Sequence, residues 1–233
     1  MLKSATVLVG AVLAAGLIAA PAAQASGTAH PNIIGGSTAS NAPWGAQIYW
    51  DSQGFECSGT IIAAQWVLTA QHCLASSGGM SVRVGSLNLG EGTQATVDRT
   101  ETAPNGDLLL LHLANAVDAT YITLGSADPA VGDTNQIYGW GRTQGSNPPS
   151  PVLKTANVQV TGTSTDAFNG PAIASKGVDG SAWHGDSGGP EIAGGVQVGV
   201  CSTGENSGSD VNGTQNYASV ANSRDWIQQT AGV

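Results

Sequence analysis

Residues 185–190 are Gly-Asp-Ser-Gly-Gly-Pro, a specific hexapeptide that stands toward the carboxyl terminus of the 233-residue chain. Its glycines let the backbone bend and leave the hydroxyl of Ser187 and the neighbouring amide groups accessible. A serine hydroxyl is a weak nucleophile, so it needs an adjacent base and a third group that fixes the tautomer of that base. A glycine-rich turn without chemistry is the alternative, and the partners that the chain supplies decide between the two.

Two other stretches carry residues of the required types. The run Leu-Thr-Ala-Gln-His-Cys at 68–73 places His72 at the end of an apolar segment. Asn-Gly-Asp at 105–107 places Asp107 directly before four leucines, where burying a carboxylate is costly unless it is paired. Taken singly, His72 would be interpreted as a structural residue, and Asp107 would be interpreted as an exposed turn residue. Taken together with Ser187, they predict nucleophilic catalysis by a histidine, a carboxylate and a serine.

The composition favours many short strands. The chain contains 33 Gly and 10 Pro, and only 10% of its residues are charged, against a usual share of roughly 25%. So few charges exclude a coiled coil or a long solvated helix. Segments of strand length without a helical period recur at 47–50, 57–62, 66–69, 81–84, 94–99, 108–113, 133–140, 156–160 and 195–202. We therefore expect an all-β fold, either an antiparallel barrel or a sandwich.

The last residues differ from this pattern. Ser223–Thr230 follows a capping-type residue pair and carries Asp225 in its first turn, which predicts one short terminal helix. Trp226, Ile227 and Thr230 would face inward.

Charge limits the partners of the protein. Seven Lys and Arg stand against sixteen Asp and Glu, a formal net charge of −9. A general nucleic-acid binder needs a basic face that neutralises phosphates, so we expect no nucleic-acid partner.

The amino terminus has the features of a secretory signal. Lys3 supplies a positive charge, an apolar run follows to Ala20, and Ala23-Gln24-Ala25 has the small-x-small pattern of a cleavage site. A membrane anchor is the alternative, but a spanning helix needs about 20 apolar residues. We predict a signal peptide at 1–25, a secreted protein and no membrane attachment after the signal is removed.

Export makes a disulfide possible for the three cysteines. Cys57 and Cys73 are close in sequence and are the obvious pair, whereas Cys201 lies in an apolar run and is expected to be a buried free thiol. Their scattered positions do not have metal-ligand spacing, so we expect no metal site.

The order and the flanking residues of His72, Asp107 and Ser187 resemble those of the chymotrypsin/trypsin-like serine proteases. Further stretches are similar to family segments over about 200 residues: Ile33–Gly36, Ser58–Ile62, Gly139–Gly141, Val198–Ser202, and Tyr217–Val220 followed by Trp226-Ile227. The resemblance implies a protease domain at 33–233. It would consist of two antiparallel six-stranded barrels, at approximately 33–125 and 126–220, with the active site between them and a short carboxyl-terminal helix.

The resemblance also implies the roles of the residues. Ser187 would attack the peptide carbonyl, His72 would act as the base, and Asp107 would orient His72. The backbone N–H groups of Gly185 and Ser187 would form the oxyanion hole. This chemistry needs no cofactor. We expect a monomeric secreted serine endopeptidase acting on proteins or peptides, with a secreted serine esterase or a catalytically dead binding homologue as alternatives. A secreted β-sandwich adhesin would leave the motifs unexplained.

Family members of this kind are made as zymogens. The resemblance implies a propeptide at 26–32 and an ion pair between the freed amino group of Ile33 and Asp186. Asn32 precedes the cut, whereas the common family activation site has Arg or Lys there.

Substrate preference follows from the pocket that the resemblance implies. Ser181 would form its base, which is neutral and disfavours Lys or Arg before the cut, so we expect a preference for apolar side chains. Gln215 would narrow one wall of the pocket. The full set of predicted pocket residues is Ser181, His184, Ser202, Thr203, Gly204 and Gln215. His112 receives no role and is expected to pack in the core.

Overall fold

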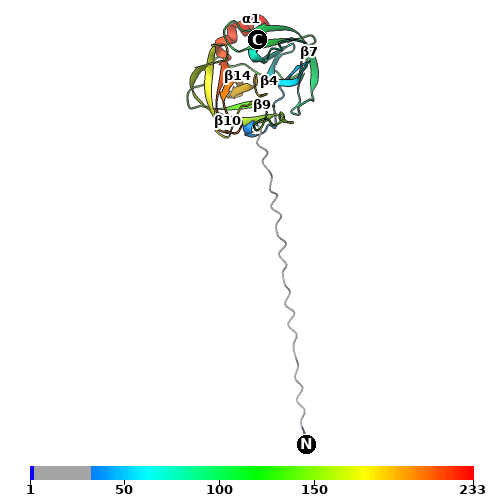
Figure 1. Ribbon diagram of the computed structural model, residues 1–233, viewed down its shortest axis with the longest axis vertical. Coiled ribbons are helices and arrows are strands. Elements are labelled where there is room, and N and C mark those ends of the chain that lie inside the picture. The colour runs from blue at the N-terminus through cyan, green and yellow to red at the C-terminus, as the bar shows by residue number, and fades with distance from the viewer. Residues whose placement is uncertain (3–32) are drawn as a thin grey trace.

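The computed structural model describes residues 1–2 and 33–233 (Figure 1). All of the predicted propeptide, and the predicted signal peptide beyond Leu2, lie outside the described residues. The described chain from 33 onward is mostly strand, arranged as two barrels with one short helix at the carboxyl terminus.

The first barrel is a closed ring of six antiparallel strands in the order β3-β4-β5-β8-β7-β6. Its strands are β3 (Gly45–Trp50), β4 (Gly54–Ala63), β5 (Trp66–Thr69), β6 (Met80–Val84), β7 (Thr93–Thr102) and β8 (Leu109–Leu113). Successive side chains of a strand point to opposite faces. Leu109, Leu110 and Leu111 are nevertheless all fully buried, so both faces of β8 are covered at this point.

The second barrel contains six strands that close through the pairing of β10 with β11. They are β9 (Thr134–Gly139), β10 (Lys154–Thr165), β11 (Pro171–Gly177), β13 (Pro190–Ala193), β14 (Val196–Glu205) and β15 (Thr214–Ser219). The all-β prediction and its two six-stranded antiparallel barrels are therefore confirmed.

The first two described strands pair with later strands of the chain rather than with the first barrel. β1 (Ile34–Gly35) pairs with β12 (Gly180–Ser181), and β2 (Ser37–Thr38) pairs with the start of β10. Only β2 extends the sheet of the second barrel, whereas β1 and β12 form a separate two-stranded sheet. The boundary expected near residue 125 falls in the connection between β8 and β9.

The expected terminal helix is present as α1 (Arg224–Ala231), preceded by the 3₁₀ turn η2 (Ala221–Ser223). Ile227 is fully buried and Trp226 is partly buried against the same apolar cluster. The helix ends at Gly232, whose φ of +78° is the left-handed conformation that favours glycine. None of the described helices has the length and apolarity needed to cross a membrane.

A disulfide joins Cys57 and Cys73, and Cys201 is a buried free cysteine, as expected. The disulfide ties β4 to η1 (Gln71–Cys73), the short turn that carries His72.

Candidate active site

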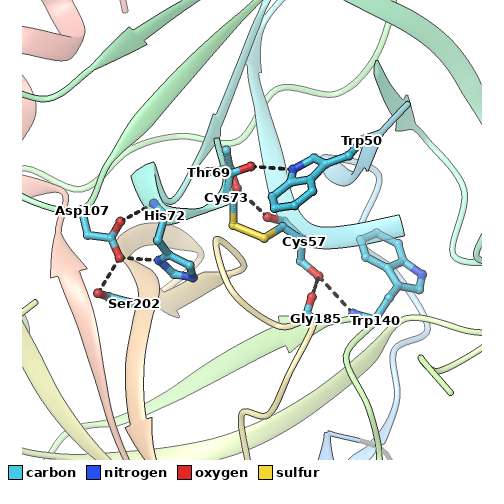
Figure 2. The surroundings of a disulfide bond; sticks show 10 residues. Trp50, Cys57, Thr69, His72, Cys73, Asp107, Trp140, Gly185 and Ser202 are labelled. Carbon is cyan, nitrogen blue, oxygen red and sulfur yellow. Dashed lines mark hydrogen bonds and ion pairs between the residues drawn. A yellow bond between two sulfur atoms is a disulfide. The ribbon is translucent and has the colours of Figure 1, made fainter. Parts of the chain in front are cut away.

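His72 and Asp107 are brought together by the pairing of two neighbouring strands. His72 follows β5 and Asp107 precedes β8, and these antiparallel strands pair with Thr69 opposite Leu109. The His72 backbone N–H donates to Asp107 Oδ1 over 2.9 Å, and the ring Nδ1 lies 2.7 Å from Asp107 Oδ2 (Figure 2). These two contacts hold the imidazole in one orientation. They engage Nδ1 and do not involve Nε2, the other ring nitrogen.

Two residues of the second barrel hold Asp107 in place. Ser202 in β14 donates its hydroxyl to Asp107 Oδ2 over 2.6 Å (Figure 2). The backbone N–H of Asp107 donates to Asp166 Oδ2 over 2.7 Å. Asp107 is fully buried, and its carboxylate accepts hydrogen bonds from the His72 backbone and from Ser202.

The turn around Ser187 is held by Ser58 of the first barrel. The Ser58 hydroxyl donates to the carbonyl of Gly185 and its backbone N–H donates to the carbonyl of Ser187, each over 2.9 Å. Gly185 has φ +95°, and a Cβ there would lie 2.9 Å from the Cα of Gly141. Both carbonyls are thus engaged. In the described part of the chain the N–H groups of Gly185 and Ser187 donate to no acceptor, so they remain available.

Two open cavities meet at Ser187, and His72 and His184 line both of them. The larger has a volume of about 560 Å³, and its other lining residues are Trp50, Gln53, Phe55, Glu56, Cys57, Arg142, Pro149 and Gly185. The smaller has a volume of about 320 Å³, and its other lining residues are Ala182, Trp183, Cys201, Ser202, Thr203 and Gly204. His72 comes from the first barrel and Ser187 from the second, so the cavities lie between the barrels.

The smaller cavity contains four of the six residues predicted for the specificity pocket: His184, Ser202, Thr203 and Gly204. Ser181 and Gln215 do not line it. Ser181 is buried and donates its hydroxyl to the carbonyl of Asp210, while Asn206 Nδ2 donates to that hydroxyl. Gln215 is buried and its Oε1 accepts the N–H of Ala182. Both side chains therefore form hydrogen bonds within the protein, although Gln215 Nε2 has no partner among the described residues.

Sequence reasoning missed three of the residues that line this cavity, namely Ala182, Trp183 and Cys201. Each of them is adjacent in sequence to a residue that was predicted for the pocket, namely Ser181, His184 or Ser202. The signal was therefore present, but which neighbour faces the cavity is decided by the turn and by the bulge in β14 between Cys201 and Thr203.

Asp186 lies beneath the turn and is fully buried. Its Oδ1 accepts the N–H of Gly141 over 2.8 Å and its Oδ2 accepts the N–H of Trp183 over 2.9 Å. Burial raises the pKa of this carboxyl from 3.8 to about 7, an effect that the two N–H donors offset only in part. Ile33 is also fully buried and has φ +45°, a left-handed conformation that is rare for a β-branched residue.

His112 is not in the core, contrary to expectation. It lies in β8 but alternates with the buried Leu111 and Leu113, so its ring points to the outer face. There its Nδ1 lies 2.6 Å from Oδ1 of the exposed Asp98. It lines neither of the two cavities.

Comparisons with known proteins agree with this architecture. The family model described as Trypsin matches residues 33–227. Trypsin delta of Drosophila erecta is 33% identical over 235 residues, covering 85% of this chain and 88% of that protein. The venom plasminogen activator LV-PA of Lachesis muta muta is 30% identical over 207 residues, covering 78% and 80%. The solved structure of human heparin binding protein is 25% identical with a TM-score of 0.74, covering 85% and 96%. The chain therefore belongs to the trypsin family of chymotrypsin-like serine endopeptidases.

Proposed function

We propose that this protein is a secreted endopeptidase in which Ser187, His72 and Asp107 form a catalytic triad. The observation that carries the proposal is the convergence of these groups. The buried Asp107 orients His72, and His72 and Ser187 share the walls of two cavities. The free N–H groups of Gly185 and Ser187 lie in the same turn and suit a developing oxyanion.

The reaction follows from these positions. Ser187 Oγ forms a bond to the peptide carbonyl carbon while its proton passes to His72 Nε2. The negative charge on the former carbonyl oxygen is met by the two backbone N–H groups. When the C–N bond breaks, His72 returns the proton to the leaving amine and an acyl-enzyme remains on Ser187. Water then attacks the acyl group with His72 again taking the proton, which releases the carboxylic acid and restores Ser187.

The smaller cavity supports a preference for an uncharged side chain at the residue before the cleaved bond. None of its nine lining residues is Asp or Glu, so nothing in its wall would pair with the cation of Lys or Arg. A peptide library scanned at this position should show cleavage after apolar residues, and efficient cleavage after Lys or Arg would refute the assignment.

The zymogen mechanism extends the proposal to Asp186 and Ile33. A buried carboxylate is stabilised most by a nearby cation. Among the described residues, the hydrogen bonds to Asp186 come from backbone N–H groups and not from a cation. A new α-amino group at Ile33 would supply one after cleavage of the Asn32–Ile33 bond. We expect Ile33→Gly and Asp186→Ala to be secreted but nearly inactive. Full activity in purified Asp186→Ala would disprove the ion pair.

Secretion is proposed from the amino-terminal sequence alone. Export of the protein with a new amino terminus at Ser26, followed by a form that begins at Ile33, would support both processing sites. Amino-terminal sequencing of the exported protein measures them directly.

The shared fold does not by itself establish catalysis, because one similar structure bears the name heparin binding protein. The net charge of −9 disfavours binding of a polyanion to this chain. A serine-directed covalent inhibitor should label the wild-type protein but not Ser187→Ala. Absence of labelling in wild-type protein that begins at Ile33 would favour a binding protein, whereas labelling without peptide cleavage would favour an esterase.

A further inference from the structure

The turn between β10 and β11 is built around one carboxylate, that of Asp166. Its Oδ1 accepts the backbone N–H groups of Phe168 and Gly170, over 2.9 and 2.8 Å. Its Oδ2 points out of the turn and accepts the backbone N–H of Asp107, which stands 59 residues earlier in the chain. One buried side chain thus shapes a turn of the second barrel and binds the main chain of the first.

The same turn reaches Asp107 by a second path. The backbone N–H of Ala167 donates to Ser202 Oγ over 3.0 Å. The same hydroxyl donates its own proton to Asp107 Oδ2, at 2.6 Å. The turn therefore holds the backbone of Asp107 directly and its carboxylate through Ser202.

Packing leaves little freedom between the two segments. A Cβ on Gly106 would lie 2.8 Å from Asp166 Oδ2. The φ of Gly106 is +130°, a backbone conformation that residues other than glycine rarely adopt. A Cβ on Gly170 would clash with the Cα of Gly106. The turn is pressed against the residue that precedes Asp107, so a shift of one is passed to the other.

We propose that Asp166 is a positioning residue that fixes the His72–Asp107 pair across the two barrels. The inference rests on the proposed function, since it assigns Asp166 a role in the same reaction. Without its carboxylate the N–H of Asp107 would be buried with no acceptor, which is costly. The Asp107 segment would then move to find another partner, and the plane of its carboxylate would turn relative to the imidazole.

Two substitutions break this link in different ways. Asp166→Asn keeps the size but has one oxygen, which cannot serve both the turn and the N–H of Asp107. Asp166→Ser keeps a short acceptor for the turn but does not reach Asp107. Asp133→Asn is the matched control, because Asp133 also accepts a backbone N–H, that of Ala130 over 2.9 Å, in an exposed turn of the second barrel.

The first measurement is peptide hydrolysis, with kcat calculated per site labelled by a serine-directed inhibitor. Both variants at Asp166 should lose about tenfold to hundredfold in kcat with KM nearly unchanged, because a small misplacement of catalytic groups slows the chemical step. The control should keep its kcat. A purely structural role for Asp166 would lower the labelled fraction or the melting temperature and leave kcat per labelled site unchanged.

The second measurement is the proton NMR signal of the Nδ1–H between His72 and Asp107, recorded in the Ser187→Ala background. A proton in a short charged hydrogen bond is deshielded, so its signal should move in Asp166→Asn and Asp166→Ser but not in Asp133→Asn. An unmoved signal would overturn the inference. If the wild type cleaves no peptide, the proposed function fails, and this spectrum still decides the role of Asp166.

Discussion

The first barrel contains two histidine–aspartate pairs with nearly the same contact distance. His72 Nδ1 lies 2.7 Å from Asp107, and His112 Nδ1 lies 2.6 Å from Asp98. The two aspartates differ in environment, since the side chain of Asp107 is 0% exposed and that of Asp98 is 46% exposed. Asp107 also accepts hydrogen bonds from the His72 backbone and from Ser202. Among the described residues, the Asp98 carboxylate has a hydrogen-bond contact only with His112.

The difference teaches that a histidine–carboxylate contact alone does not identify the proposed catalytic pair. His112 stacks edge-on against Trp66 at 4.8 Å, and Arg99 lies over the same indole at 5.1 Å, so that pair belongs to a surface cluster of side chains. Neither His112 nor Asp98 lines the two cavities that meet at Ser187. Burial of the carboxylate and convergence on a cavity distinguish His72 and Asp107.

Replacing the aspartate of each pair should give the largest contrast. Asp107→Asn should reduce kcat by about 10⁴-fold, the magnitude of the general triad template, because the amide stabilises the wrong tautomer of His72. Asp98→Asn should leave kcat unchanged. Steady-state peptide hydrolysis measures both, and circular dichroism provides the control for folding. Equal activity of the two variants would contradict the distinction.

Glu191 tests what burial does to a carboxylate that has no histidine. Its Oε1 accepts from Asn135 and Ser175, and its Oε2 has no partner among the described residues. Burial raises the pKa of Glu191 from 4.5 to about 7, with a smaller contribution from Asp128. The folded protein therefore binds this proton more tightly than the unfolded chain, so the stabilisation is complete below pH 4.5 and is lost as the pH rises through 7.

We expect the free energy of unfolding to fall by about 2–3 kcal/mol between pH 4.5 and 8 on account of this group. Glu191→Gln should remove that part of the pH dependence. Denaturant unfolding in the Ser187→Ala background, which prevents self-digestion, gives the difference between the two proteins. A difference that does not change with pH would show that Glu191 does not titrate in this range.

Ser202 tests the additional hydrogen bond that only the buried pair has. Ser202→Ala should lower kcat about tenfold, because a hydrogen bond to a charged group contributes roughly 1.5–3 kcal/mol. Ser219→Ala is the matched control, since Ser219 donates to Asp128 over the same 2.6 Å but away from the two cavities. Peptide hydrolysis per labelled site measures the effect. An equal loss in both variants would point to a general effect on the second barrel.

The parts of the site that sequence could predict are those with a local signature. The Gly-rich turn around Ser187 and the order of His72 and Asp107 are visible in short stretches, and the fold followed from the same resemblance. Ser202 was selected only as a pocket residue. Its contact with Asp107 joins positions 95 residues apart, and that of Asp166 joins positions 59 apart. Neither contact leaves a pattern in one sequence.

Two further differences have physical causes of the same kind. The leucine-rich run around His112 suggested the core, but alternation along β8 turns that residue outward. Ser181 and Gln215 were expected in the pocket wall, yet the turn containing Asn206 and Asp210 covers Ser181, and Gln215 binds Ala182. Strand direction and loop packing decide these cases, and a single sequence specifies neither at the level of one side chain.

The exposed pair should contribute least to stability. Asp98→Asn should lower the free energy of unfolding by less than about 1 kcal/mol, because solvent screens a half-exposed ion pair and holding two side chains together costs entropy. High salt should reduce any electrostatic part of this contribution. Denaturant unfolding of Ser187→Ala with and without the second substitution, at low and high salt, measures both effects. A salt-independent loss well above 1 kcal/mol would mean that Asp98 stabilises the Trp66 cluster by fixing the ring of His112. The two pairs would then differ in their proposed role in catalysis but not in their contribution to stability.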